Sequence, residues 1–410
     1  MKKLIALTIF ISGSLLMVSC GGDDDPIGLT DQEKQEAALA AAATAVGNVV
    51  TTDASAAGMS ATEITTAFGW TASQGRIASS TVGMARINVT ANIAQDETWT
   101  SDNIYQLDGR ITVLDGATLT IEAGTRLEGN ADLSGENAAV LMIARGGMLM
   151  ANGTAQNPII MTSTADDGTL TADDKGKWGG LVILGKAPVS AKVDNPQIEG
   201  VPADDTNGLY GGTDAADNSG TIRYVSIRHG GAIIDAAAGD EINGLTLGGV
   251  GSGTTIEYVE VYANSDDGIE FFGGTVDVDY ALVAQVGDDA LDVDQSYAGT
   301  VTNFAVYVDE NSDEGLEIDG REGDLDDTFT LTKGTITAVG GASITCDFKS
   351  KAKGSVSNLN ANGGTIKLSA SFDSETFEQS EDAAQNVVNG SLTFSSVNAA
   401  YSIYTTSFDE

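Results

Sequence analysis

Apolar residues in the middle of the chain occur in short alternating runs that are separated by Gly, Asn and Asp. Residues 111–121 (ITVLDGATLTI) form two such runs around a turn, and residues 139–144 and 158–162 continue the pattern. Alternation with a period of two is typical of β-strands, and runs this short with Gly-rich turns argue against helices. We therefore expect an all-β domain from about residue 98 onwards.

An internal repeat predicts how these strands are arranged. Four similar segments begin at Leu245, Ile269, Leu291 and Leu316, at spacings of 24, 22 and 25 residues. A period near 23 residues fits one coil of a parallel β-helix, in which coils bury their apolar positions by stacking on one another. Leucine-rich repeats have a similar period, but their Leu and Asn framework is missing here, and a propeller blade needs about 40 residues.

Apolar pairs that precede these segments predict which side chains stack inside the coils. The pairs are Val225 with Ile227, Val259 with Val261, Ala281 with Val283, and Val306 with Val308. We therefore expect one inward column of Val259, Ala281 and Val306, and a second of Val261, Val283 and Val308. All of these segments should pair in parallel.

Four further segments resemble the signatures of a family of exported bacterial lipoproteins. They are residues 178–188 (WGGLVILGKAP), 208–212 (GLYGG), 223–231 (RYVSIRHGG) and 241–253 (EINGLTLGGVGSG). The resemblance covers about residues 98–310. It implies a right-handed parallel β-helix on a secreted or surface-anchored protein, in a family to which no activity is assigned.

The N-terminus has the layout of a lipoprotein signal. Lys2 and Lys3 precede a short apolar run, and residues 17–20 (MVSC) resemble a lipobox. We expect residues 1–19 to be removed and Cys20 to be acylated, for example with palmitate, so that the membrane is reached through this lipid anchor. The acidic residues 23–25 resemble an export tag, which implies the outer face of the outer membrane.

The remaining boundaries follow from composition. We expect a lipidated acidic tether at residues 20–29, a short helix at 30–47, and a spacer with some strands at 48–97. The β-helix should occupy residues 98–324, followed by further β coils or a cap at 325–410. The chain has 59 acidic and 20 basic residues, a formal charge of −39. This charge argues against nucleic acid as a partner and suits cations or neutral partners.

The repeat also aligns acidic residues, and these are the candidate metal ligands. One column contains Asp267, Asp289 and Glu314, and a second, three residues further on, contains Glu270, Asp292 and Glu317. Coils lie about 4.8 Å apart, so stacked carboxylates repel one another unless a cation or a proton relieves them. We expect a Ca²⁺ site centred on Asp288, Asp289 and Asp292, with Glu270 or Glu317 reaching in from a neighbouring coil. The alternative is a solvated acidic ladder.

The basic residues and the single histidine bear on whether the domain is an enzyme. A β-helix lyase needs a basic residue near its cation, yet the acidic coils contain no Lys or Arg, and Arg223 and Arg228 lie one coil earlier. We expect a turn or packing role for His229, the sole histidine. Residues 348–353 (FKSKAK) form a basic patch that either neutralises the acidic surface or is a solvated turn.

These features favour a surface lipoprotein whose β-helix is a binding or adhesive module, dependent on Ca²⁺, for a polysaccharide or another surface protein. We identify no catalytic residue. A carbohydrate-active β-helix enzyme, such as a polysaccharide lyase or glycoside hydrolase, is the alternative, and a purely structural surface protein is the second alternative. The fold alone does not decide among them.

Overall fold

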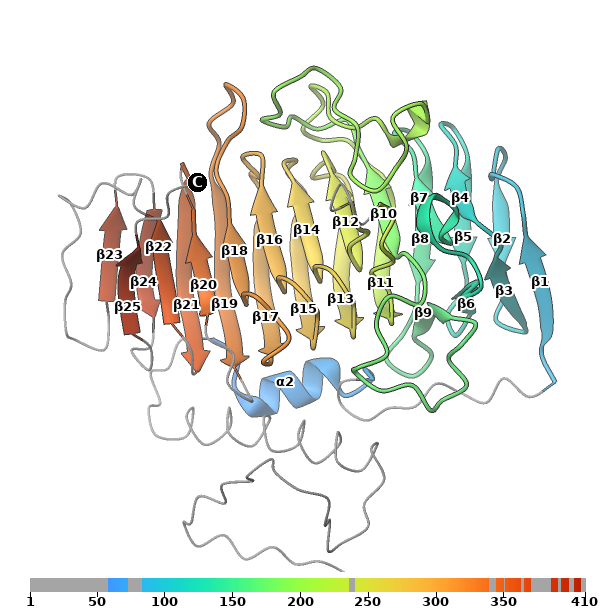
Figure 1. Ribbon diagram of the computed structural model, residues 1–410, viewed down its shortest axis with the longest axis horizontal. Helices are drawn as coiled ribbons and strands as arrows, with labels where there is room; N and C mark the ends of the chain where they lie inside the picture. Colours follow the sequence, from blue (N-terminus) through green and yellow to red (C-terminus); the bar gives the residue numbers. More distant parts are fainter. Residues whose placement is uncertain are drawn as a thin grey trace, which may run out of the picture.

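Two parallel sheets run along the molecule and share one chain that winds through both (Figure 1). The computed structural model describes residues 58–72, 83–235, 240–338, 344–349, 351–362, 365–369, 385–389, 392–397 and 402–406. Within these residues the named strands pair in parallel, except β23 with β24, which are antiparallel. The predicted all-β, right-handed parallel β-helix is confirmed.

Sheet A collects the strands of one side. They are β1 (Ala85–Val89), β2 (Glu97–Trp99), β3 (Asn103–Leu107), β5 (Thr118–Ile121), β6 (Arg126–Gly129), β8 (Met148–Asn152), β9 (Ile159–Ser163), β11 (Gly220–Arg228), β13 (Thr255–Tyr262), β15 (Val278–Ala284), β17 (Thr300–Val308), β19 (Phe329–Ala338), β21 (Gly354–Asn362), β23 (Gln385–Asn389) and β24 (Leu392–Val397).

Sheet B collects the strands of the other side. They are β4 (Arg110–Val113), β7 (Val140–Ile143), β10 (Leu181–Leu184), β12 (Leu245–Gly248), β14 (Ile269–Phe272), β16 (Leu291–Asp294), β18 (Leu316–Ile318), β20 (Ile344–Phe348), β22 (Thr365–Ser369) and β25 (Ser402–Thr406). Two short 3₁₀ turns, η1 (Gly135–Asn137) and η2 (Thr206–Gly208), lie in the connecting loops.

Each long strand of sheet A bends sharply at one residue. In β11, β13 and β15 that residue is Tyr224, Tyr258 or Tyr280, with φ of 50°, 56° and 59°, and the register skips it. A single left-handed residue turns the chain, so each long strand supplies two faces of the coil. In the first coils the same faces are separate strands, since β8 and β9 both pair with β11. The cross-section is therefore three-sided.

The inward columns of this core differ in one place from the predicted ones. Val259 pairs with Ala281 and Val261 with Val283, as predicted. Val306, however, pairs with Val283, so it continues the second column rather than the first. Val308 lies beyond it and pairs with Ala338.

The incorrect prediction for Val306 and Val308 has a simple cause. β17 carries three apolar inward residues after its bend, at Phe304, Val306 and Val308, and all three are buried. Two registers that differ by two residues keep the same alternation, so the pattern fits both. The sequence position of the bend at Asn303 decides between them, and it is visible only in the backbone, where Asn303 has φ 53°.

An N-terminal strap, residues 58–72, packs against residues of β13, β15 and β17 and contains the helix α2 (Ala61–Phe68), which lies beneath the ends of these strands in Figure 1. A capping box between Ser60 and Glu63 starts the helix. Phe68 is fully buried and belongs to a second apolar cluster with residues of β13, β15 and β17. The strap falls in the stretch where the sequence predicted a spacer with some strands.

Two predictions for the N-terminal part concern residues outside the described part of the chain. They are the short helix at 30–47 and the acylated Cys20. No helix in the described part of the chain has both the length and the apolar character needed to cross a membrane. Beyond residue 325, strands β19 to β25 continue the two sheets.

Candidate functional site on the acidic edge of sheet B

The acidic residues gather on the turns that lead from sheet A into sheet B. We call residues 264–268, 286–290 and 309–315 the acidic turns, because they precede β14, β16 and β18 and stack on one another. Ala263 and Gln285 open the first two with φ of 55° and 58°. These left-handed residues end β13 and β15 and direct the chain towards sheet B.

Backbone hydrogen bonds connect each acidic turn to the next. The Gly268 amide donates to the Asp289 carbonyl (2.8 Å), and the Ala290 amide donates to the Glu314 carbonyl (3.0 Å). Gly268 is required here, because a Cβ at this position would lie 2.3 Å from Val283 Cγ1. The turns therefore stack closely enough to bring carboxylates of neighbouring coils together.

Side-chain carboxylates take part in the same ladder. Asp267 Oδ1 accepts the amide of Asp289 (2.9 Å), and Asp289 Oδ1 accepts the amide of Glu314 (2.7 Å). Each carboxylate thus caps the next turn. The first column predicted from the sequence is confirmed as a spatial column by these contacts.

The register of the strands also confirms the second predicted column. Glu270 pairs with Asp292, and Asp292 pairs with Glu317, on the outward side of β14, β16 and β18. Glu270 and Asp292 are nevertheless buried, each only 7% exposed. The alternative of a solvated ladder is therefore wrong for these two residues.

A loop packs close to this column. Residues 185–219, between β10 and β11, form an insertion, drawn in green at the top of Figure 1. Tyr210 of the insertion contacts Phe272 with ring centroids 6.0 Å apart, and its hydroxyl donates to Gln295 Oε1 (2.9 Å). The insertion therefore packs against the ends of the strands that carry the acidic column.

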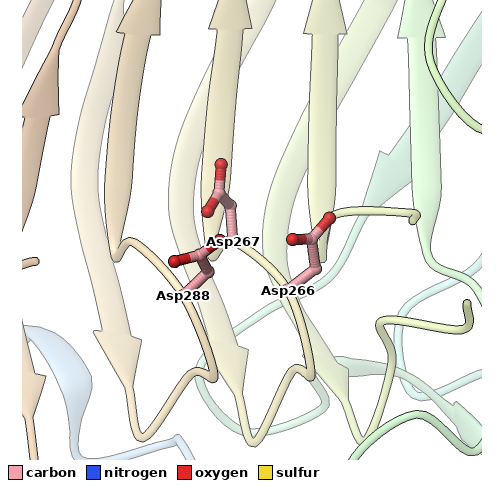
Figure 2. Close-up of side chains that lie close together, drawn as sticks. All are labelled: Asp266, Asp267 and Asp288. Atoms are coloured by element: carbon pink, nitrogen blue, oxygen red, sulfur yellow. The ribbon is translucent and has the colours of Figure 1, made fainter. Parts of the chain in front are cut away.

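The carboxylates form three groups in which oxygens of different residues lie within 4.8 Å of one another. The groups are Asp266, Asp267 and Asp288; Asp267, Glu270 and Asp292; and Asp289, Glu314 and Glu317. We call them the outer, inner and terminal groups. Figure 2 shows the outer group, whose members come from two neighbouring acidic turns.

This arrangement differs from the predicted one. The sequence centred a site on Asp288, Asp289 and Asp292 of the middle coil, but these three residues belong to three different groups. The reason is that the acidic turn and the strand after it direct successive side chains to different sides. Asp267, a candidate ligand of the first predicted column, is the residue that the outer and inner groups share, and Asp266 was not among the predicted ligands.

Burial and mutual repulsion favour protonation of these carboxyls. Burial is the main cause that raises the pKa of Asp266 to about 7, with further contributions from Glu241 and Asp288. Burial likewise raises the pKa of Asp289 to about 8. In the inner group, burial followed by neighbouring negative charge raises the pKa of all three carboxyls well above the ordinary range. A bound cation would have the opposite effect and keep them ionised.

A lysine does lie among the acidic groups. Lys349, which follows β20, forms an ion pair with Glu317 of the terminal group. The acidic coils themselves contain no Lys or Arg, as predicted, but Lys349 reaches Glu317 from the coil after them. The basic patch at residues 348–353 thus contributes at least one charge that neutralises the acidic surface.

The other basic candidates lie away from this edge. Arg228 is buried on the outer face of sheet A, where Nε donates to Ser226 Oγ (2.7 Å) and lies 3.9 Å from Glu260 Oε2. Arg223 pairs with Glu257 (2.7 Å). His229 is 3% exposed and its Nδ1 lies 2.8 Å from the Asp174 carbonyl oxygen. These contacts fit packing roles.

A pocket that the sequence did not indicate lies on the same edge, at the first coils. Its volume is about 470 Å³, and it is lined by Asp108, Gly109, Arg110, Asp132, Leu133, Ser134, Glu136 and Asn137. Arg110 is held by Asp205 of the insertion at 3.1 Å. Loop residues carry no periodic pattern, so only their assembly in space reveals the pocket.

The fold and this edge define a parallel β-helix with an acidic edge. The sequence matches the family described as the pectate-lyase like beta helix domain over residues 91–408. The chain therefore belongs to this family. The match includes residues 325–408, which the sequence signatures did not cover. No curated protein and no solved structure shows a significant match to the chain.

Proposed function

We propose that this protein is a surface-anchored β-helix module that binds polysaccharide through Ca²⁺ held at the acidic edge of sheet B. The outer group, Asp266, Asp267 and Asp288, is the observation that carries this proposal. Hard cations such as Ca²⁺ are bound by oxygen ligands, and carboxylates supply both the ligands and the charge.

The exposure of the outer group suits a recognition role. Asp288 is exposed and Asp266 is partly exposed, whereas Asp267 is 7% exposed. A cation held there keeps coordination positions that face solvent. Hydroxyl or carboxylate oxygens of a saccharide can fill those positions, because Ca²⁺ accepts six to eight oxygens.

The pocket at the first coils supports an extended partner. It lies on the same edge as the outer group, and strands β7, β10, β12 and β14 lead from one to the other. Adjacent coils are about 4.8 Å apart, so the two features are separated by roughly 15 Å along the edge. A polysaccharide chain of several residues spans that distance, which a single small molecule does not.

The location follows from the N-terminal sequence. We propose that Cys20 carries the lipid anchor and that the β-helix faces the exterior from the outer membrane. Residues 23–25 (DDD) after the anchor support export. A partner outside the cell is consistent with a polysaccharide or another surface protein.

Retention of the protein on immobilised polysaccharides tests the binding proposal. We expect the purified mature chain to be retained on at least one member of a panel in the presence of Ca²⁺ and released by a chelator. Asp288→Asn should weaken this retention at least tenfold, since it removes an outer ligand. Glu310→Gln is the matched control, because Glu310 is an exposed acid on the next acidic turn and belongs to none of the three groups. Retention that persists after the chelator is added would contradict a cation-dependent module.

A carbohydrate-active enzyme is the second candidate, and two observations favour it. The chain belongs to the pectate-lyase like family, and Lys349 supplies a basic group beside Glu317. Incubation of the same panel with the protein and Ca²⁺, followed by measurement of new reducing ends and of ultraviolet absorbance, separates the two candidates. Soluble products that disappear in Lys349→Met would favour the enzyme, whereas retention without products favours the binding module.

A further inference from the structure

The inner group has a feature that the outer group lacks. Asp267, Glu270 and Asp292 are each 7% exposed, and their oxygens lie within 4.8 Å of one another. Asp292 Oδ1 is buried and has no hydrogen-bond partner. A buried carboxylate oxygen without a donor costs free energy, so proteins rarely leave one in place unless another ligand satisfies it.

We infer that the inner group holds a second Ca²⁺ ion, which is structural and closed off from the partner. The Asp292 carboxylate lies within 4.8 Å of those of Asp267 and Glu270, and the partner that its Oδ1 lacks is then the cation itself. Three carboxylates and no nitrogen or sulfur ligand favour a hard cation over zinc or copper. This inference goes beyond the proposed function, which concerns the outer group.

The contacts around the inner group fix its ligands in place. Asn243, on the preceding turn, donates from Nδ2 to Glu270 Oε2 and orients that carboxylate. The Asp289 amide donates to Asp267 Oδ1 (2.9 Å), which leaves the second oxygen of Asp267 for a cation. We therefore describe Asn243 as a positioning residue and Asp267, Glu270 and Asp292 as the ligands.

The inner ion joins successive coils. Asp267 and Glu270 belong to the coil of β14 and Asp292 to the coil of β16, while Asn243 comes from the coil before them. One cation thus connects carboxylates of stacked coils that would otherwise repel one another. Such an ion would act as a crosslink between coils at this level of the solenoid.

Asp267 belongs to both the inner and the outer group, so it can bridge two cations. A bridging carboxylate couples the two sites: loss of the inner ion releases Asp267 and weakens the outer site. The structural ion therefore prepares the recognition site. We assign no cation to the terminal group, because Lys349 already contacts Glu317.

Calcium titration of chelator-stripped mature protein tests this inference, with calorimetry for stoichiometry and a thermal melt for stability. We expect two bound ions in the wild-type protein. Asp292→Asn and Glu270→Gln should each remove one ion and most of the Ca²⁺-dependent rise in melting temperature. Asp288→Asn should remove the other ion with little change in that rise, and Asp267→Asn should remove both. Glu310→Gln is the control and should retain two.

Terbium luminescence gives a second measurement, which distinguishes the two sites by the hydration of the bound ion. The lifetime of bound Tb³⁺ in H₂O and D₂O reports how many waters remain on the ion. We expect one Tb³⁺ with few waters, lost in Asp292→Asn, and one with several waters, lost in Asp288→Asn.

The outcomes separate the two proposals. A single ion that Asp288→Asn removes, and that Asp292→Asn still binds with the full wild-type rise in melting temperature, would overturn the inner site and leave the proposed function standing. A single, water-poor ion lost only in Asp292→Asn would support the inner site and contradict the outer one. No binding at millimolar Ca²⁺ would overturn both.

Discussion

At the scale of single residues, left-handed backbone positions decide where each coil turns. Tyr224, Tyr258 and Tyr280 occupy such positions and stack with ring centroids 4.4 Å apart and interplanar angles of 6° and 3°. Side chains other than Gly and Asn are uncommon there, because the Cβ is crowded. The stacking contacts offset that cost and align the bends of three successive coils.

Replacing the middle tyrosine tests this account. Tyr258→Asn keeps a residue that tolerates the left-handed conformation but removes both ring contacts. Aromatic pairs contribute about 0.5–1.5 kcal/mol each, so we expect a loss of about 1–3 kcal/mol in the free energy of unfolding. Urea denaturation measures it. The control is Tyr258→Phe, which keeps both ring contacts at the same position. A Tyr258→Asn protein as stable as wild type would show that the stack is incidental.

The raised carboxyl pKa values predict how stability depends on pH when cations are absent. The pKa of Asp266 is raised to about 7 and that of Asp289 to about 8, from an unfolded value of 3.8. Between pH 4 and 8 the unfolded chain loses these protons while the folded protein keeps them. The unfolded state is therefore favoured as the pH rises, and stability falls across this window and levels off above it.

Urea unfolding in the presence of a chelator at pH 5 and pH 8 tests whether stability falls as the pH rises. We expect the free energy of unfolding to be lower at pH 8, and Ca²⁺ to restore it there by about 2.7 kcal/mol at a hundredfold excess over its dissociation constant. Ca²⁺ should have less effect at pH 5, where protons compete for the same carboxylates. Stability that increases from pH 5 to pH 8 in chelator would contradict the burial argument.

The sequence predicted much of the site at this scale. Alternation correctly placed Glu270, Asp292 and Glu317 on the outward side, because Leu and Phe neighbours fix the inward side. It could not show that Glu270 and Asp292 are buried, since the insertion that covers the strand ends has no periodicity. It also could not show that Asp267 joins two groups, because this depends on how far each turn rotates its side chains.

At the scale of elements, the N-terminal strap is the part that the sequence missed. Residues 47 to about 90 are rich in Ala, Ser and Thr without a clear period. α2 has eight residues, too few for a helical period to stand out. Tertiary contacts stabilise it instead: the Met59 amide donates to Thr335 Oγ1 (3.1 Å), and the Ala72 amide donates to Glu260 Oε2 (3.0 Å).

We predict that the strap protects the face of sheet A beneath it. Phe68 is fully buried in this second cluster, so Phe68→Ala should cost about 3–5 kcal/mol and release the strap before the coils unfold. Limited proteolysis should then cleave within residues 58–72 and leave the β-helix intact. Thr66→Ala, an exposed position on the same helix, is the control. Cleavage that begins in the coils instead would contradict a separately released strap.

At the scale of the whole molecule, the repeat was sufficient to predict the architecture. Segments with a 22–25-residue spacing cannot bury their apolar residues alone, and parallel stacking is the solution that also aligns their polar residues. The core that results is one cluster that reaches from Ile93 to Leu359. The register of β17 and the three-sided cross-section needed the backbone, because alternation alone does not locate a bend.

The lipid anchor is a prediction about the whole chain. Cys20→Ala should stop acylation and release the protein from the membrane fraction, since the acyl chains on Cys20 are the membrane attachment that we propose. Metabolic labelling with a palmitate analogue and fractionation measure this. A Cys20→Ala protein that still partitions with membranes would contradict the lipobox interpretation.

The net charge of −39 predicts a dependence on salt that differs from the dependence on Ca²⁺. The Debye length falls from about 10 Å at 0.1 M to about 3 Å at 1 M, which is less than the spacing of about 4.8 Å between coils. Repulsion between exposed carboxylates of adjacent coils is therefore screened at high salt. We expect the melting temperature of the chelated protein to rise gradually with KCl.

Screening should not replace a bound ion, because Asp267, Glu270 and Asp292 are buried and are screened little by mobile salt. We therefore expect millimolar Ca²⁺ to raise the melting temperature further even in 1 M KCl, and this increment to be absent in Asp292→Asn. The gradual KCl effect should persist in that variant, since its exposed charges are unchanged. If 1 M KCl abolished the Ca²⁺ increment in the wild-type protein, Ca²⁺ would be acting as a diffuse counterion rather than as a ligand of these carboxylates.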